Sequence, residues 1–178
     1  GSVLKKFYHK QGDTTSLQSN SILSLAEDSD GNIWMGTSSG ICCYVKSKQS
    51  FFSVQVPQSI YGGSNIVCSI CFIDTKQMWC GTEGGLFLYN TGSKKFTPYF
   101  NTVSDGKDNH RYCNNIGKLV QDAEKNLWLC TKDGFWKFNP ANKFFKKING
   151  QPGTPFNALC LYAFESSDKK IWFGNWQY

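Results

Sequence analysis

The stretch from Asn20 to Ile41, NSILSLAEDSDGNIWMGTSSGI, holds two short apolar runs separated by a cluster of turn-forming residues. The runs are Ser21–Glu27 and Ile33–Thr37, and the cluster is Asp28 to Asn32. Apolar runs joined by Asp, Asn and Gly predict a β-hairpin. Two more short runs follow, at Ile41–Val45 and Ser50–Val54. This part of the chain therefore predicts four short antiparallel strands.

The same pattern recurs along the chain. Its tryptophan returns at intervals of 45, 49 and 44 residues, as Trp34, Trp79, Trp128 and Trp172. A glycine follows two residues later, as Gly36, Gly81 and Gly174, and another six residues later, as Gly40, Gly85 and Gly134. Self-similarity at such a period is the signature of a repeat architecture.

The apolar runs predict how the repeats pack. Adjacent residues such as Ile33, Trp34 and Met35 are apolar, so both faces of each small sheet are expected to be buried. Sheets covered on both sides and repeated along a chain describe blades around an axis. The predicted fold is all-β, with β-propeller blades of four antiparallel strands. The tryptophan is expected to be a wedge between blades, the first glycine to allow close approach, and the second to form a turn with positive φ.

Counting in this register divides the chain and leaves the ring incomplete. We expect an outer strand of a preceding blade at 1–10, blade 1 at 11–56, blade 2 at 57–100, blade 3 at 101–149, and the first two strands of blade 4 at 150–178. A partial ring exposes blade faces, and exposed apolar faces associate. We therefore predict self-association, as a homodimer, or pairing of Val3–His9 with the terminal blade.

The stretch Asn20–Ile41 resembles the two-component regulator propeller repeat, and Phe7–Leu17 resembles the linker between its blades. The resemblance covers nearly the whole chain, with departures such as Cys130 for a glycine and Asn175 for a threonine. It implies a seven-bladed ring in the periplasmic sensor region of hybrid histidine kinases of Bacteroides-type bacteria. Many of these respond to glycan fragments. The kinase and the rest of the sensor chain would lie outside this segment.

Composition and motifs argue against several other classes. The formal net charge is +6, but the lysines are scattered among turns, so nucleic acid is not an expected partner. No apolar run approaches the roughly 20 residues that span a bilayer, so no membrane contact by this segment is expected.

No phosphate-binding loop or nucleophile elbow is present, and His9 and His110 lack a second ligand at metal spacing. The sequence predicts no catalytic residue, no cofactor and no metal, hence no enzyme. The oxygens of Asp28 to Asn32 suit calcium, but the other repeats lack that pattern, which favours plain turn chemistry.

The eight cysteines lie mostly in apolar, strand-like segments. Cysteine there acts as a small hydrophobic residue, so buried free thiols are expected. A zinc site and disulfides are the alternatives. The spacing of Cys68 and Cys71 speaks against zinc, because residues three apart in a strand point to opposite faces.

Alternating strand directions place the linkers between blades and the turns between the second and third strands on one face of the ring. The longest linker, Tyr99 to Cys113, is rich in charged and aromatic groups, and such loops on a rigid scaffold commonly carry function. Arg111 has the geometry to clamp an anionic group, and Tyr61 or Tyr112 to stack on a sugar. The candidate ligand-binding residues are Tyr61, His110, Arg111, Tyr112 and Lys132.

These observations predict a non-catalytic sensor segment that recognises a carbohydrate-like ligand outside the cytoplasm, in the periplasm. The first alternative is a protein–protein interaction or assembly module that holds no small ligand. The second is a propeller enzyme such as a lyase or a glycosidase, which would need an acid and a base near the axis.

Overall fold

The computed structural model describes residues 4–102, 113–149 and 160–175. Within these ranges the elements are strands, and no helix is long and apolar enough to cross a bilayer. The strands form three four-stranded antiparallel sheets and one hairpin, each in chain order. Their bounds are β1 Ile22–Glu27, β2 Ile33–Thr37, β3 Gly40–Val45, β4 Ser50–Val54, β5 Val67–Phe72, β6 Gln77–Thr82, β7 Gly85–Asn90, β8 Lys95–Tyr99, β9 Ile116–Gln121, β10 Leu127–Thr131, β11 Gly134–Asn139, β12 Phe144–Ile148, β13 Cys160–Glu165 and β14 Ile171–Asn175.

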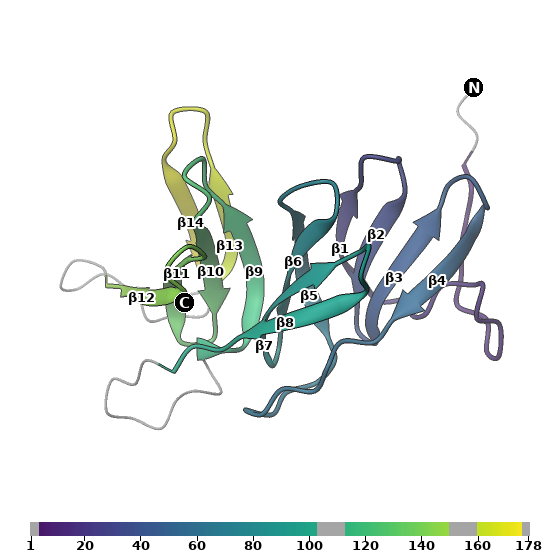
Figure 1. Cartoon of the computed structure of the whole chain (residues 1–178), viewed down its shortest axis with the longest axis horizontal. Helices are drawn as coiled ribbons and strands as arrows, with labels where there is room; N and C mark the ends of the chain where they lie inside the picture. The colour runs from purple at the N-terminus through teal and green to yellow at the C-terminus, as the bar shows by residue number, and fades with distance from the viewer. Residues whose placement is uncertain (1–3, 103–112, 150–159, 176–178) are drawn as a thin grey trace.

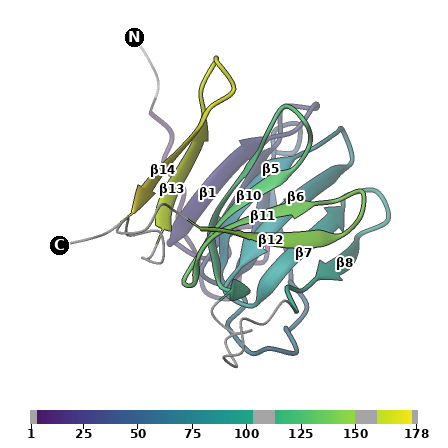
Figure 2. The ribbon, with the colours of Figure 1, turned by 90° about the vertical axis from the view of Figure 1, so that its left-hand side faces the viewer.

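The sheets stand side by side with their first strands innermost. Strand β1 contacts β5, β5 contacts β9, and β9 contacts β13. Figure 1 shows the sheets in a row, and Figure 2 shows the same row turned by a quarter turn. Both views show an open array. The structure confirms an all-β fold of propeller blades in an incomplete ring, and we call the four sheets blades 1 to 4.

Each innermost strand carries an irregularity at the same place in the repeat. The pairing of β1 with β2 shifts between Ile22 and Ser24, and that of β5 with β6 shifts between Val67 and Ser69. Equivalent shifts occur where β9 pairs with β10 and where β13 pairs with β14. A bulge bends its strand and increases the local twist. The bend therefore lies at one end of every strand that lines the axis.

Neighbouring blades are held by apolar layers that we call blade joints. In the joint between blades 1 and 2, Trp34 packs edge-on against Phe72 and at a tilt against Tyr89, at ring centroid distances of 6.1 and 6.0 Å. In the next joint, Trp79 meets Phe138 at 5.7 Å. In the third, Trp128 lies 5.8 Å from Phe173. The first three tryptophans of the repeat therefore act as the predicted wedges.

Two expectations about the ends of the array are wrong. Trp172 is exposed rather than wedged, because no sheet among the described residues covers that face of blade 4. The outer strand expected at 1–10 is not formed in its described part, where residues 4–10 pair with no strand. This segment meets blade 1 through side chains and not through backbone pairing, as where Lys5 Nζ donates to Gln49 Oε1 at 3.1 Å. It is anchored by Phe7, whose ring contacts those of Tyr44 and Phe51.

The glycines have the two roles predicted from the repeat. Gly40, Gly85 and Gly134 have positive φ values of 121°, 149° and 95° in the turns between second and third strands. At Gly36, an added Cβ would lie 2.5 Å from the carbonyl oxygen of Val67 on the next blade. A side chain at that place would force β2 of blade 1 and β5 of blade 2 apart.

Most of the described cysteines are free thiols, as expected. They are Cys42, Cys43, Cys68, Cys71, Cys80 and Cys113. Burial raises the pKa of Cys43 to about 12, so this thiol stays protonated at neutral pH. Cys130 is the exception, because it is disulfide-bonded. It lies at the joint between blades 3 and 4, where buried side chains of two sheets meet.

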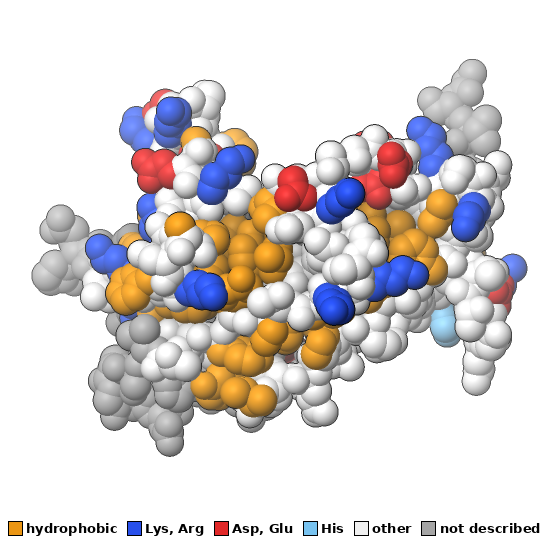
Figure 3. Space-filling model, viewed as in Figure 1, with side chains coloured by type: hydrophobic (Ala, Val, Ile, Leu, Met, Phe, Trp, Pro, Cys, Tyr) orange, Lys and Arg blue, Asp and Glu red, His pale blue; other side chains and the backbone are white. Residues whose placement is uncertain are grey.

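In blades 1 and 3 an aspartate six residues before the tryptophan accepts a hydrogen bond from the indole N–H. Trp34 Nε1 donates to Asp28 Oδ2, and Trp128 Nε1 donates to Asp122 Oδ2, both at 2.8 Å. The same carboxylates accept backbone N–H groups of their own turns. The oxygens of Asp28 are thus engaged by the turn, as the turn interpretation of Asp28 to Asn32 predicted. In Figure 3 charged side chains lie along the upper edge of the view, where these turns are.

Blade 2 lacks this acceptor. Ile73 occupies the equivalent place, and its N–H bonds Gln77 O as that of Asp28 bonds Asn32 O. Trp79 Nε1 is consequently buried without a hydrogen-bond partner. Asp74, one residue further along, caps only the backbone N–H groups of Lys76 and Gln77.

Replacing Asp122 with alanine is expected to lower the free energy of unfolding by about 1–3 kcal/mol near pH 7, because buried donors lose their acceptor. Burial opposes ionisation of Asp122, but hydrogen bonds from Trp128 and Asn126 outweigh it and hold its pKa below the usual value. A carboxylate with a lowered folded-state pKa stabilises the fold above its unfolded pKa of about 3.9 and loses that contribution as the pH falls further. The deficit of Asp122→Ala should therefore shrink below about pH 4, measured by urea unfolding at several pH values.

The matched control is Asp74→Ala, which removes a turn carboxylate that holds no indole. Asp74→Ala should lower the free energy of unfolding clearly less than Asp122→Ala does. Equal losses for the two variants would show that the indole bond adds nothing.

Candidate functional site

The turns between second and third strands and the linkers between blades are bonded together on one face, which we call the linker face. The same backbone bond occurs in three blades. It joins the N–H of Ser38, Glu83 and Lys132 to the carbonyl oxygens of Ser21, Ile66 and Asn115, respectively. Side chains add to it, since Gln18 Nε2 donates to Ser39 O at 2.8 Å. The predicted gathering of these loops on one face is confirmed.

A threonine stabilises each of these turns. Thr37 Oγ1 donates to Gly40 O at 2.9 Å and accepts the N–H of Ser39 at 3.1 Å. Thr82 and Thr131 make the same pair of bonds in their own turns. The glycine of this turn was predictable from the repeat, and the recurrence of threonine three residues after the tryptophan is the sequence signal for the turn-stabilising role.

Asparagines close two of the linkers. Asn20 Oδ1 accepts the N–H of His9 at 2.7 Å, and Asn114 Oδ1 accepts that of Asn101 at 2.8 Å. Asn114 also returns a bond from Nδ2 to Asn101 O. Each bond joins the two ends of a linker.

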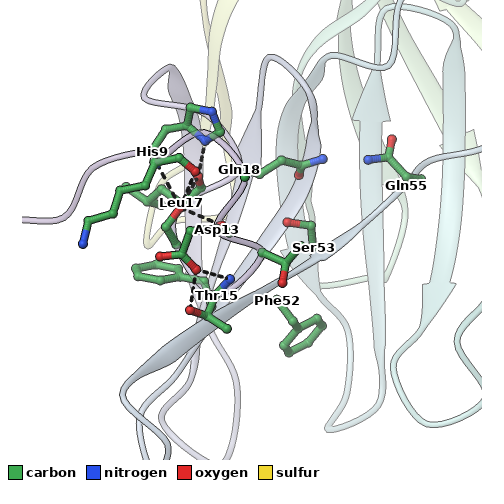
Figure 4. Close-up of a pocket in the computed structure, with 13 residues that line it drawn as sticks. His9, Asp13, Thr15, Leu17, Gln18, Phe52, Ser53 and Gln55 are labelled. Atoms are coloured by element: carbon green, nitrogen blue, oxygen red, sulfur yellow. Dashed lines mark hydrogen bonds between the residues drawn. The ribbon is translucent and has the colours of Figure 1, made fainter.

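A cavity of about 630 Å³ lies between the first linker and strand β4. In Figure 4, His9, Asp13 and Thr15 lie on one side, Ser53 and Gln55 on the other, and Gln18 between them. The linker is tied to β4 by the N–H of Phe51, which donates to Thr15 O at 3.0 Å. The cavity volume falls in the range of small-molecule pockets, roughly 300–1,000 Å³.

The polar side chains of this cavity differ in whether their hydrogen-bonding atoms already have a partner within the protein. His9 Nδ1 lies 2.7 Å from Leu17 O, so that ring nitrogen is occupied. Hydrogen bonds from Thr15 lower the pKa of Asp13, which is therefore an anionic acceptor at neutral pH. Gln18 Oε1 is buried and has no hydrogen-bond partner. Buried polar oxygens are nearly always paired, so this one is a vacant acceptor.

This arrangement suits the binding of a hydroxyl-rich molecule. Asp13 and Gln18 offer oxygens that accept hydroxyl protons, while Ser53 and Gln55 can both donate and accept. Phe52 also lines the cavity, and its ring packs edge-on against that of Trp34, 5.5 Å away. Among the described residues no group of three or more His, Cys, Asp or Glu side chains is placed to hold a metal ion.

The structure places two of the five predicted ligand residues. Tyr61 lies in the linker from β4 to β5, with its ring 5.4 Å from that of Phe100. Lys132 is exposed in the turn between β10 and β11. Both belong to the linker face, and no direct contact joins them. His110, Arg111 and Tyr112 lie outside the described residues.

Glu83 and Lys132, from the turns of two neighbouring blades, both act electrostatically on Cys68. The pKa of Cys68 on β5 is raised to about 11, because burial and the charge of Glu83 raise it more than the charge of Lys132 lowers it. The turns of blades 2 and 3 therefore bring a negative and a positive group to the same innermost strand. Glu83 Oε2 also accepts a bond of 2.6 Å from Ser64 Oγ in the linker.

The cavity of the first linker was missed by sequence reasoning. Residues 11–19 were interpreted only as a connection, although they are rich in hydroxyl and amide side chains. What the sequence could not show is that the linker folds back onto β4, which adds Ser53 and Gln55.

Part of the first repeat matches a known protein family. Residues 16–39 match the family model described as two component regulator propeller. The match spans the end of the first linker, β1, the Asp28 turn and β2. No curated protein matches the chain in sequence.

Solved structures share the fold. The chain is similar to the extracellular domain of a putative hybrid two component system from B. thetaiotaomicron, at 22% identity and a TM-score of 0.73, over 90% of this chain and 21% of that one. A second such domain from B. thetaiotaomicron gives 18% identity and a TM-score of 0.65, over 97% and 28% of the two chains. A streptogramin B lyase is 13% identical, with a TM-score of 0.64, over 94% of this chain and 54% of that one. The chain thus spans less than a third of the length of these two extracellular domains.

Proposed function

We propose that this chain, which carries a two component regulator propeller repeat at residues 16–39, is a ligand-recognition segment of the extracytoplasmic sensor of a hybrid two component system. The repeat match is the observation that carries the proposal. The fold shared with extracellular domains of two such systems supports it. We place the segment in the periplasm and assign it no catalytic role, with the kinase elsewhere in the protein. The lyase, at 13% identity, shares the fold alone.

We assign the linker face as the ligand site and a carbohydrate-like molecule as the ligand. The vacant Gln18 Oε1 and the anionic Asp13 supply acceptors for hydroxyl groups. Tyr61, Lys132 and the residues His110, Arg111 and Tyr112 extend the proposed site across the linkers. A ligand held there would signal by favouring one arrangement of the receptor over another, since equal affinity for both shifts nothing.

Calorimetric titration with a panel of neutral and anionic oligosaccharides tests this assignment. We expect at least one to bind, and Gln18→Leu to weaken that binding about 3- to 10-fold, the equivalent of one hydrogen bond. Tyr61→Ala should weaken the same ligand if the site extends along the face. Thr97→Ala, on the exposed outer strand β8, is the matched control and should leave affinity unchanged.

The outcomes separate the parts of the proposal. Binding that neither Gln18→Leu nor Tyr61→Ala affects would overturn the linker-face site. Failure of every oligosaccharide to bind would overturn the carbohydrate class of ligand.

A second function, that of an assembly module, is favoured by a separate observation. Large apolar side chains are exposed on both end blades, among them Leu23 and Leu25 on blade 1 and Phe164 and Trp172 on blade 4. Surfaces of this kind mark protein–protein contacts.

A further inference from the structure

A cavity of about 370 Å³, which we call the joint cavity, lies between blades 2 and 3. Both blades are complete four-stranded sheets, and every lining residue belongs to one of them. Blade 3 contributes the turn between β9 and β10 and the turn between β11 and β12. Because the strands are antiparallel, these turns lie at the end of the blades opposite the linker face. The lining residues include Ile73, Trp79, Gln121, Lys125, Asn139 and Pro140.

The indole of Trp79 forms part of the cavity wall, and its N–H is a donor that lacks an acceptor. Trp79 is 2% exposed, and its Nε1 is buried with no hydrogen-bond partner. Buried polar groups are nearly always paired, because an unpaired donor has lost its bonds to water and gained nothing in return. The N–H of Trp79 therefore marks a place where an acceptor is missing.

Blades 1 and 3 show which acceptor this donor takes. Trp34 and Trp128 each donate from Nε1 to a carboxylate oxygen at 2.8 Å, and the carboxylate belongs to the aspartate six residues earlier. In blade 2 that position is Ile73, which lines the joint cavity. The Ile73 side chain is only partly buried against the core of this joint, so it is the group that would turn aside to admit an acceptor.

The remaining wall suits a small organic anion. The volume falls in the range of small-molecule pockets, roughly 300–1,000 Å³. Both blades supply apolar surface, and Lys125 brings a positive charge to the rim. Glu124 also lines the cavity, but its Oε2 accepts a bond of 3.3 Å from Asn126 Nδ2 and lies 3.9 Å from Lys137 Nζ. The charge of Glu124 is thus offset within blade 3.

We propose that the joint cavity binds a small organic carboxylate with an apolar body, and that the N–H of Trp79 donates to it. The ligand supplies the carboxylate that Asp28 and Asp122 supply in blades 1 and 3. Its apolar body lies between the blades, against the indole and Ile73, and Lys125 attracts its charge. The inference is independent of the carbohydrate proposal, because the joint cavity and the linker face lie at opposite ends of the blades.

NMR titration of the ¹⁵N-labelled chain with benzoate is the test. The indole N–H signal of Trp79 is identified among those of the six tryptophans by its absence in Trp79→Phe. We expect benzoate to shift this signal until it saturates. Benzyl alcohol has a similar body without the carboxylate and should bind about 10-fold more weakly, since hydrogen bonds to charged groups are the stronger ones. A Trp79 signal that does not move at millimolar benzoate, or that benzyl alcohol moves equally well, would overturn the proposal.

Two variants at Ile73 form a matched pair. Ile73→Asp supplies the carboxylate that blades 1 and 3 possess, so it should engage the N–H of Trp79 and weaken benzoate binding about 10-fold or more. Ile73→Ala removes the same side chain without adding an acceptor and should bind benzoate at least as tightly as the wild type. The dispersion of the amide signals verifies that both variants fold. Equal affinity of the two variants for benzoate would show that the N–H of Trp79 is not the donor.

Discussion

Trp34→Ala and Trp79→Ala are each expected to lower the free energy of unfolding by about 3–5 kcal/mol, the cost of removing a large buried aromatic side chain. Both indoles are almost fully buried, and each packs against rings of the following blade. Their loss leaves a cavity in a joint that two sheets share, so neither sheet alone can close it. Urea unfolding followed by circular dichroism measures the difference.

Trp172→Ala is the matched control within the same repeat. Its indole is exposed and contacts no further blade, so the variant should lose less than about 1 kcal/mol when measured at protein concentrations too low for self-association. A loss at Trp172 as large as that at Trp34 would mean that the indole stabilises its own sheet rather than the joint between sheets.

Gly36→Ala is expected to cost about 1–3 kcal/mol or more, although alanine usually stabilises a strand relative to glycine. The added methyl group would lie 2.5 Å from Val67 O, a backbone atom of the innermost strand of blade 2. At Gly81 the nearest atoms are side-chain carbons of Ile116 and Leu119, which can yield. Gly81→Ala should therefore cost less than Gly36→Ala, as thermal or urea unfolding can show.

Gly174 supplies the control for this pair. A Cβ there meets only Tyr162 Cβ at 3.7 Å, which is an ordinary contact. Gly174→Ala should be neutral or slightly stabilising. If Gly36→Ala were equally harmless, the close approach of neighbouring sheets would not be what requires glycine at this place.

The sequence predicted the blades well because the determinants of a blade are local. Alternating turn clusters and apolar runs set β1 to β4, and the structure moves only the start of two strands by one residue, β1 to Ile22 and β3 to Gly40. Tryptophan spacing predicted the wedges because a repeat places equivalent residues in equivalent joints. Trp172 was the exception, since its burial depends on a neighbouring sheet and not on its own segment.

The site was predicted less completely because it depends on contacts distant in sequence. The gathering of Tyr61 and Lys132 on one face follows from strand direction alone. The cavity does not, because it requires the first linker to fold back and bond Phe51 of β4 through Thr15. The vacant oxygen of Gln18 arises only after its amide nitrogen has bonded Ser39 across the loop.

The chain of contacts from β1 to β5, β9 and β13 has a consequence for cooperativity. Within the described residues the main contacts between sheets join neighbours, so stability is a sum of sheet terms and nearest-neighbour coupling terms, as in a one-dimensional Ising array. In this segment studied by itself, blades 1 and 4 have one described coupling partner each and should fray first, while blades 2 and 3 melt last. Amide hydrogen exchange would then record a gradient of protection that is highest in the middle of the chain.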